Sequence, residues 1–221
     1  MKKYLLSALV LDFDLYPRGS IDNHHVTQIA AAISAGCSMP PIVIEKASKR
    51  IVDGFHRWKA YRRLYGEEYS TNCIEKIYPG DSQLLLDAMR FNASHGRALT
   101  QHDKTHCILL AQKLKISSEL VAEALNLTSE RIGKLKTDRI GTIGSQPLAL
   151  KQTIRHMSGR KLTKRQASAN EKLSGMNQMF YVNQLLTLLE TDLIDTANTD
   201  LRSRLARLQE AISDFLKKQA A

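Results

Sequence analysis

The stretch IVDGFHRWKAYRRLYG, from Ile51 to Gly66, decides how the first part of this chain folds. It begins with two β-branched residues, turns at Asp53-Gly54, and continues with residues that favour a basic helix. A strand that leads through a glycine turn into a helix directs backbone N–H groups and the positive end of the helix dipole at one point. With His56 and Arg57 in the first helical turn, an anion is the expected ligand, most naturally a phosphate. An ordinary strand–turn–helix with a solvated basic face is the equally weighted alternative.

The residues on either side predict a compact α+β domain. Strands are expected at residues 5–13, 42–45, 51–52 and 72–78, where apolar runs end at Pro or Gly turns. Asp22 is a suitable N-cap for a helix whose apolar positions have helical spacing and which ends at Gly36. The predicted order is strand, helix, strand, strand, helix, strand.

The segment DGFHRWKA, from Asp53 to Ala60, resembles the phosphate-binding motif of the ParB/sulfiredoxin superfamily, in which Gly precedes His-Arg or Arg-Arg and then Ala. The order of the surrounding segments also resembles ParB N-terminal domains. Pro17-Arg18, the helix at 22–35 and the PPIVI strand at 40–44 come at matching intervals. The likeness covers about residues 1–170.

A second phosphate-contacting motif of ParB, Glu-Asn-x-x-Arg, corresponds to the segment RFNASHGRALT at 90–100. Asn92 matches its Asn, whereas Phe91 and His95 stand where the family has Glu and Arg. Because that acid is associated with metal and hydrolysis in the family, the resemblance implies nucleotide binding without implying hydrolysis.

The ligand that the resemblance implies is a ribonucleoside triphosphate, CTP first or else ATP, with Mg²⁺. The implied nucleotide-binding residues are Arg18, Asp53, Gly54, His56, Arg57, Asn92 and His95. Weak CTPase activity is the enzymatic option, with no catalytic residue assigned and no protein metal ligand predicted. Sulfiredoxin chemistry is not expected, because Phe55 stands where that reaction needs a reactive cysteine.

A helix-turn-helix is predicted farther along the chain. Ser117 or Ser118 begins a helix that ends near Leu125, and the next helix runs from about Ser129 to Ile140. Asn126 stands where such motifs usually carry glycine, and asparagine tolerates the left-handed conformation that this turn requires. The expected DNA contacts of the second helix are Thr128, Ser129, Glu130, Arg131, Lys134, Lys136 and Thr137. A plain three-helix packing unit is the competing interpretation.

Capping boxes predict two further helices, one that begins after Thr100 and one that begins after Thr163. The segment 159–163, GRKLT, resembles a Gly-Lys-Leu-Ser/Thr step that follows the helix-turn-helix of ParB proteins. Basic residues expected to contact the DNA backbone here are Arg160, Lys161 and Lys164. A solvated charged face is the alternative for any one of them.

The composition favours a polyanionic partner. The chain has 221 residues with a formal net charge of +10 and a pI near 9.6, which favours nucleic acid before acidic lipid. Its three cysteines form no CxxC pair, so neither a zinc cluster nor a disulfide framework is implied and a cytoplasmic setting fits. The apolar run near the start is short and ends in acids, so we expect a strand there, and no segment approaches transmembrane length.

The C-terminal tail is helical in composition. An a/d seam of two heptads predicts either a homodimer or packing on the same chain; its members are Leu201, Leu205, Leu208, Ile212 and Phe215. The expected fold is an α+β ParB/sulfiredoxin-like N-terminal domain at 1–98, an all-α helix-turn-helix domain at 99–175, and a helical tail at 176–221.

The resulting expectation is a protein that binds double-stranded DNA, in plasmid or chromosome partition or in transcriptional regulation. The alternatives are a small-molecule kinase or a nuclease on the same fold, or an adaptor whose pocket is vestigial. A kinase needs no helix-turn-helix. A nuclease needs a metal-binding acid cluster near Gly54, where the sequence offers only Asp53.

Overall fold

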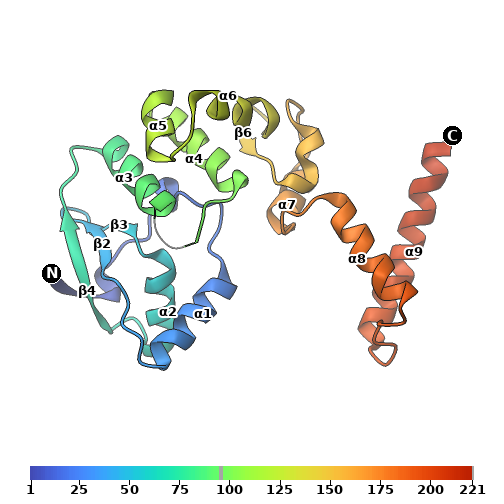
Figure 1. Cartoon of the computed structure of the whole chain (residues 1–221), viewed down its shortest axis with the longest axis horizontal. Helices are drawn as coiled ribbons and strands as arrows, with labels where there is room; N and C mark the ends of the chain where they lie inside the picture. Colours follow the sequence, from blue (N-terminus) through green and yellow to red (C-terminus); the bar gives the residue numbers. More distant parts are fainter. Residues whose placement is uncertain (95–96, 221) are drawn as a thin grey trace. The chain divides into compact units, whose positions relative to one another are not determined.

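The computed structural model describes residues 1–94 and 97–220. Met1–Gly175 form one compact unit, and Met176–Ala221 form another (Figure 1). Within the described residues, no helix combines the length and the apolar character needed to span a membrane.

The first unit contains a four-stranded sheet in the order β1-β4-β2-β3. The strands are β1 (Lys2–Leu5), β2 (Ile42–Glu45), β3 (Ile51–Asp53) and β4 (Ser70–Lys76). Strand β4 pairs antiparallel with β1 and parallel with β2, and β2 pairs antiparallel with β3. The sheet therefore has the mixed α+β character that the element order predicts.

The first strand shares only Leu5 with the predicted run at 5–13, so that prediction is wrong in its position. After β1 the chain forms 3₁₀ helices at Leu6–Ala8 and Phe13–Leu15. The fully buried Leu6 belongs to the core beside α2, and its carbonyl accepts a hydrogen bond from the indole of Trp58 at 3.1 Å. This burial turns the chain away from the sheet.

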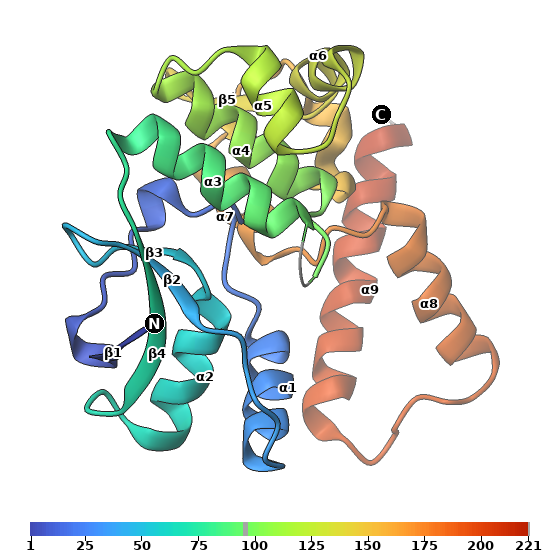
Figure 2. The ribbon, with the colours of Figure 1, turned by 60° about the vertical axis from the view of Figure 1, so that its left-hand side comes forward.

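Both faces of the sheet are covered, because neighbouring residues of β2 point to opposite sides. Ile42 and Ile44 pack in one core with α2 (Phe55–Tyr65). Val43 packs in the other core with α3 (Asp81–Ser94). Figure 2 shows α3 across the sheet from α1 and α2. The uninterrupted apolar run of β2 is what a strand buried on both faces requires.

Helix α1 (Asn23–Ser34) begins as predicted, with the Asp22 carboxylate accepting from the backbone N–H groups of His24 and His25. It packs lengthwise on α2, and the contact is close because it is made through Val26, Ala30 and the fully buried Ala60. This pairing brings the start of α1 near the start of α2.

Three helices follow the sheet: α4 (Gln101–Lys113), α5 (Ser118–Ala124) and α6 (Ser129–Asp138). Their predicted caps are confirmed, with a Thr100–Asp103 capping box at α4 and Ser117 as the cap of α5. Their apolar side chains share one core with α3 and with Val52 of the sheet. The sheet and the three helices are therefore packed into one unit.

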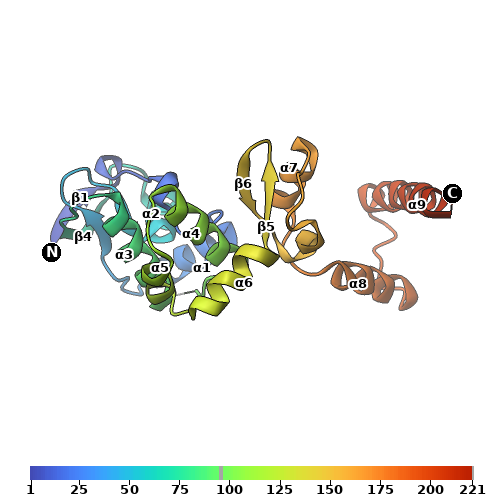
Figure 3. The same ribbon diagram turned by 90° about the horizontal axis from the view of Figure 1, so that it is seen from above.

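A two-stranded hairpin follows α6, in a region where only helices were expected. Strands β5 (Ile140–Ile143) and β6 (Gln146–Ala149) pair antiparallel and precede α7 (Lys164–Lys172), and Figure 3 shows them between α6 and α7. The turn uses Gly144 at φ +61°. A Gly-Ser pair that directly follows the β-branched residues Thr142 and Ile143 is a hairpin signal, so the hairpin could have been predicted from the sequence.

The second unit consists of α8 (Gln178–Glu190) and α9 (Thr199–Ala220). Neither helix has a buried residue. Apolar side chains that remain exposed include Val182, Leu186, Leu189, Ile212 and Phe215.

Candidate functional site

A cavity of about 600 Å³ lies at the start of α2; we refer to it as the α2 cavity. Six of the seven residues expected to bind nucleotide line it: Arg18, Asp53, Gly54, His56, Arg57 and Asn92. The seventh, His95, lies outside the described residues. Arg97, which the sequence analysis did not single out, also lines the cavity. The remaining wall is largely apolar and includes Ile29, Met39, Pro41, Val43, Ile74 and Phe91.

Gly54 is required at its position by both conformation and space. Its φ is +113°, a region that side-chain-bearing residues rarely adopt, and an added Cβ would lie 3.1 Å from the Ile42 side chain. It is the N-cap of α2 and has no side chain to occupy the first N–H groups of the helix. Since the first turn from Gly54 to Arg57 lines the cavity, the positive end of α2 is available to an anion there.

Arg57 is held by the protein itself. Its Nη1 donates to the carbonyl oxygens of Pro40 at 2.6 Å and Pro41 at 2.8 Å, and its Nη2 donates to Asp53 Oδ2 at 2.6 Å. The guanidinium thus links the loop before β2 to the end of β3. Its geometry is that of a residue that positions the cavity wall.

Arg18 is the cation with spare hydrogen-bonding capacity. It is 7% exposed, and it donates from Nε to Asn92 Oδ1 at 3.0 Å and from Nη2 to the carbonyl of Arg97 at 2.6 Å. Both acceptors are neutral, and Nη1 is buried with no hydrogen-bond partner among the described residues. Because buried donors are nearly always paired in folded proteins, this nitrogen calls for an acceptor from a ligand or from water.

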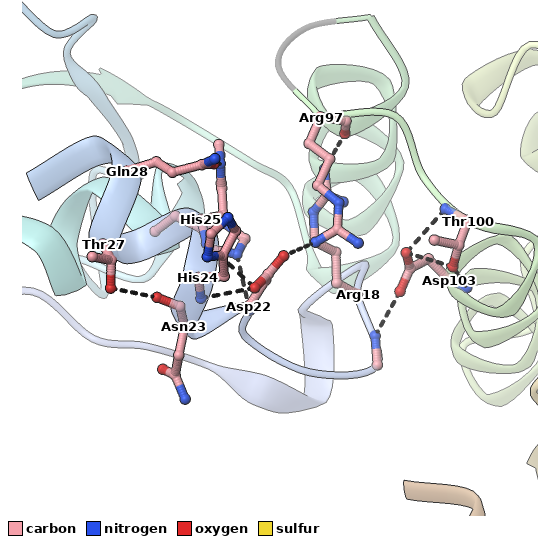
Figure 4. A network of polar contacts seen from close by, with 12 residues as sticks. Arg18, Asp22, Asn23, His24, His25, Thr27, Gln28, Arg97, Thr100 and Asp103 are labelled. Carbon is pink, nitrogen blue, oxygen red and sulfur yellow. Dashed lines mark hydrogen bonds and ion pairs between the residues drawn. The ribbon is translucent and has the colours of Figure 1, made fainter. Parts of the chain in front are cut away.

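His56 is neutral at physiological pH. Burial, reinforced by the nearby charges of Arg18 and His25, lowers its pKa to about 4. Its Nε2 accepts a hydrogen bond from the backbone N–H of Asp22 at 3.3 Å, so a neutral ring carries its proton on Nδ1. Asp22 also forms an ion pair with Arg97 (Figure 4). His56 can therefore offer a hydrogen bond to a ligand but not a full charge.

The acids near this cavity do not make up a metal site by themselves. Asp53 is the one carboxylate among the described residues that line the α2 cavity, and it is paired with Arg57. No group of three or more His, Cys, Asp or Glu side chains suited to a metal occurs in residues 1–94 and 97–220. Phe91, where ParB proteins have an acid, is half-buried with the Lys76 ammonium 4.7 Å from its ring centroid.

Helices α5 and α6 meet across the tight turn that the sequence predicts, and Asn126 has the expected left-handed conformation at φ +51°. Side chains at the start and on the outer face of α6 are exposed, namely Thr128, Ser129, Glu130, Lys134 and Thr137. Two of the expected DNA contacts are half-buried against neighbouring helices. Arg131 donates to Gln101 Oε1 at 3.0 Å, and Lys136 donates to Ser118 Oγ at 2.8 Å, because both lie next to the buried stripe of α6.

The three basic residues expected beyond the helix pair, Arg160, Lys161 and Lys164, are all exposed around the start of α7. The segment is anchored to the hairpin, since the N–H of Leu162 donates to the carbonyl of Thr142 at 2.7 Å. The predicted capping box between Thr163 and Gln166 is confirmed. The backbone that carries these three cations is therefore held in place by the hairpin and by the cap of α7.

Comparison with known proteins gives few relatives in sequence. No protein-family model matches the chain. A protein of Streptomyces griseus described as a possible regulatory protein of the streptomycin biosynthesis operon is 25% identical over 118 residues. The match covers 52% of this chain and 32% of that relative, so the chain spans about a third of the relative's length.

Three solved structures are similar in fold. ParB of Caulobacter crescentus bound to the parS site is 16% identical, with a TM-score of 0.43 over 61% of this chain and 70% of that chain. The same ParB with CTP-gamma-S is 16% identical over 61% and 75% of the two chains, with a TM-score of 0.37. A Pnob8-like ParB-N domain is 13% identical over 67% and 56%, with a TM-score of 0.39.

The class of protein defined by the fold is a mixed α+β protein with a helical C-terminal portion. All three of these similar structures are ParB proteins or domains.

Proposed function

We propose that this chain is a ParB-like DNA-binding protein that attaches to a specific double-stranded site and is gated by a nucleoside triphosphate, CTP before ATP. The observation that carries the proposal is the convergence of Arg18, Gly54, His56 and Asn92, far apart in sequence, on one cavity. The role is partition of DNA or regulation of transcription. The description of the Streptomyces griseus relative as a possible regulatory protein is in keeping with the second.

The nucleotide would bind with its phosphates at the first turn of α2 and near the unpaired Nη1 of Arg18. The apolar side chains of Met39, Ile74 and Phe91 offer a surface for the base and ribose. Mg²⁺ would enter with the phosphates of the nucleotide, because the carboxylate of this cavity is already paired with Arg57. It would neutralise phosphate charge in the bound state.

DNA would be read by α6, whose outer face is free of bulky side chains around Gly133. Glu130 and Lys134 would reach base edges, while Thr128 and Ser129 contact phosphates at the helix start. Arg160, Lys161 and Lys164 would add backbone contacts, and the net charge of +10 would give these contacts a strong salt dependence.

The two functions would be linked through α3. This helix carries Asn92 near its end, and its Arg90 donates to Glu123 of α5 at 3.0 Å. The apolar side chains of α3 share one core with those of α5 and α6. A ligand that moved Asn92 would therefore shift the helix on which α5 and α6 are packed.

The second unit would make the protein a homodimer. Helix α9 presents the apolar seam that includes Leu208, Ile212 and Phe215, all exposed in the single chain. Two copies would suit a DNA site with two-fold symmetry. Light scattering should give twice the chain mass for the wild type and the chain mass for Leu208→Glu. A monomeric wild type would overturn this part of the proposal.

The nucleotide part is tested by calorimetric titration of CTP and ATP, each with Mg²⁺, into the whole chain. Arg18→Ala should weaken binding at least tenfold, because it removes a charge-assisted hydrogen bond. Arg165→Ala, which removes an exposed cation from α7, should leave binding unchanged. Equal affinities of the wild type and Arg18→Ala would show that the site is misplaced, and release of a phosphorylated small-molecule product would favour the kinase.

A further inference from the structure

A second cavity, of about 560 Å³, shares Arg18 and Arg97 with the α2 cavity; we refer to it as the basic cavity. Ser174 and Gly175 line part of it, and most of its walls come from three segments of the first unit. They are the start of α1 at 20–23, the start of α4 at 100–103, and the residues Arg139, Lys151 and Gln152 beside the hairpin. Of the residues proposed above to contact nucleotide or DNA, Arg18 is the one that also lines this cavity.

The acids of the basic cavity are already occupied (Figure 4). Asp22 accepts from the backbone at the start of α1 and pairs with Arg97. Asp103 accepts from the N–H of Gly19 at 3.1 Å and from the N–H of Thr100 at 3.0 Å. Both carboxylates therefore serve as helix caps and are not open to a cationic ligand.

The cations outnumber the acids. Four positive side chains line the basic cavity, Arg18, Arg97, Arg139 and Lys151, against the two carboxylates. Arg139 donates to the neutral Gln152 Oε1 at 2.5 Å, and no carboxylate in the described part of the chain lies within ion-pair distance of Arg18 or Arg139. Burial, then the charges of Arg155 and Arg131, lower the pKa of Arg139, as expected where positive charge is crowded. An anion would relieve this crowding.

We propose that the basic cavity binds a small molecule bearing phosphate, separately from the nucleotide of the α2 cavity. Its volume is in the range of small-molecule sites, which is roughly 300–1,000 Å³, and arginine forks match the geometry of phosphate oxygens. Duplex DNA fits less well, because Arg18 is only 7% exposed and backbone phosphates approach from outside.

Ligand binding in the basic cavity would affect α6, the helix proposed to read DNA. Arg139 is the C-cap residue of α6, whereas the opposite wall belongs to α1 and α4. A phosphate held between Arg139 and the wall formed by the starts of α1 and α4 would tie the end of α6 to the sheet-containing part of the unit. The ligand would thereby restrict how far α6 can move.

The test uses inorganic pyrophosphate as the probe, titrated calorimetrically into the whole chain. Arg139→Gln should weaken binding about tenfold, the effect of losing one charge-assisted hydrogen bond of about 1.4 kcal/mol. Arg165→Gln, at an exposed site on α7, removes the same charge and should change affinity less than twofold. Ile74→Trp, which obstructs the α2 cavity, should leave pyrophosphate binding intact.

A second variant tests the same proposal in case Arg139→Gln does not fold. Asn23→Asp places an acid on the cavity wall, at an exposed position in the first turn of α1 where acids stabilise a helix. It should fold normally and weaken pyrophosphate binding. The proposal is overturned if the wild type does not bind, if Arg165→Gln loses as much as Arg139→Gln, or if Ile74→Trp abolishes binding. Displacement of pyrophosphate by a short DNA duplex would assign the cavity to the DNA surface instead.

Discussion

Arg18 and Asn92, 74 residues apart in the sequence, are joined by a hydrogen bond of 3.0 Å from Arg18 Nε to Asn92 Oδ1. Asn92 is itself fixed, because its Nδ2 donates to the carbonyl of Ala88 at 2.9 Å. The pair connects the loop before α1 to the last turns of α3 and aligns a buried guanidinium with one nitrogen to spare. Two motifs that are separate in sequence thus line one cavity.

Asn92→Ala should destabilise the protein by about 1–3 kcal/mol, because the buried Arg18 loses an acceptor. Nucleotide binding should weaken with it. Asn92→Asp keeps an acceptor for Arg18 and should retain stability, yet it should still weaken CTP binding because a carboxylate repels phosphates. Urea unfolding and calorimetric titration measure the two effects. Wild-type behaviour of Asn92→Ala in both would refute the role given to this pair.

Arg57→Ala should cost about 2 kcal/mol of unfolding free energy, because three acceptors lose their donor, two of them in part-buried surroundings. Arg57→Lys should not restore this loss, since an ammonium cannot reproduce the planar fork. Arg62→Ala, at a more exposed position of the same helix, should change stability by less than about 0.5 kcal/mol. If Arg57→Lys unfolds at the same urea concentration as the wild type, the three hydrogen bonds of the Arg57 guanidinium do not stabilise the fold as proposed.

Six of the residues that sequence reasoning proposed for nucleotide binding line the α2 cavity, because they lie in short motifs with local physical signatures. Gly54 and the first turn of α2 are one example, and the Asp22 cap is another. Sequence reasoning could not assign Arg57 to the loop before β2 or recognise Arg97, since both depend on contacts between distant segments. Which side chains pair across a fold depends on how its elements pack together. The spacing of residues in the sequence does not reveal these pairs.

The same distinction holds in the helical part. The turn at Asn126 and the caps of α4, α5 and α7 were predictable from residue type alone. The inward placement of Arg131 and Lys136 was not, because both lie at the border of the buried stripe and either direction is compatible with helical spacing.

Stability should fall as the pH is lowered from about 6.5 towards 4. The pKa of His56 is about 4 in the folded chain against an ordinary value of 6.5, so in this window the unfolded chain binds a proton that the folded chain does not. Burial lowers the pKa of His102 and His106 as well, which adds to the same trend. His56→Gln should reduce the difference between the unfolding free energies at pH 7 and pH 5. An unchanged difference would contradict a buried neutral His56.

Substitutions at Gly133 can distinguish an effect on stability from an effect on DNA binding. Its Cβ would meet open space, so Gly133→Ala should stabilise α6 by about 0.5–1 kcal/mol through helix propensity. Gly133→Trp should fold equally well but block entry of α6 into the major groove. Thermal unfolding and a gel-shift titration with duplex DNA distinguish the two effects. Unimpaired DNA binding by Gly133→Trp would exclude α6 as the reading helix.

The central claim is most directly tested by selecting DNA from a random-sequence pool with the purified whole chain, with and without CTP and Mg²⁺. We expect one site with two-fold symmetry to be enriched, with an affinity that CTP changes in the wild type but not in Arg18→Ala. Enrichment that no nucleotide alters would contradict the gating. A pool that shows no enrichment would contradict site-specific DNA binding altogether. It would favour the alternative in which the α2 cavity is the site of a small-molecule enzyme.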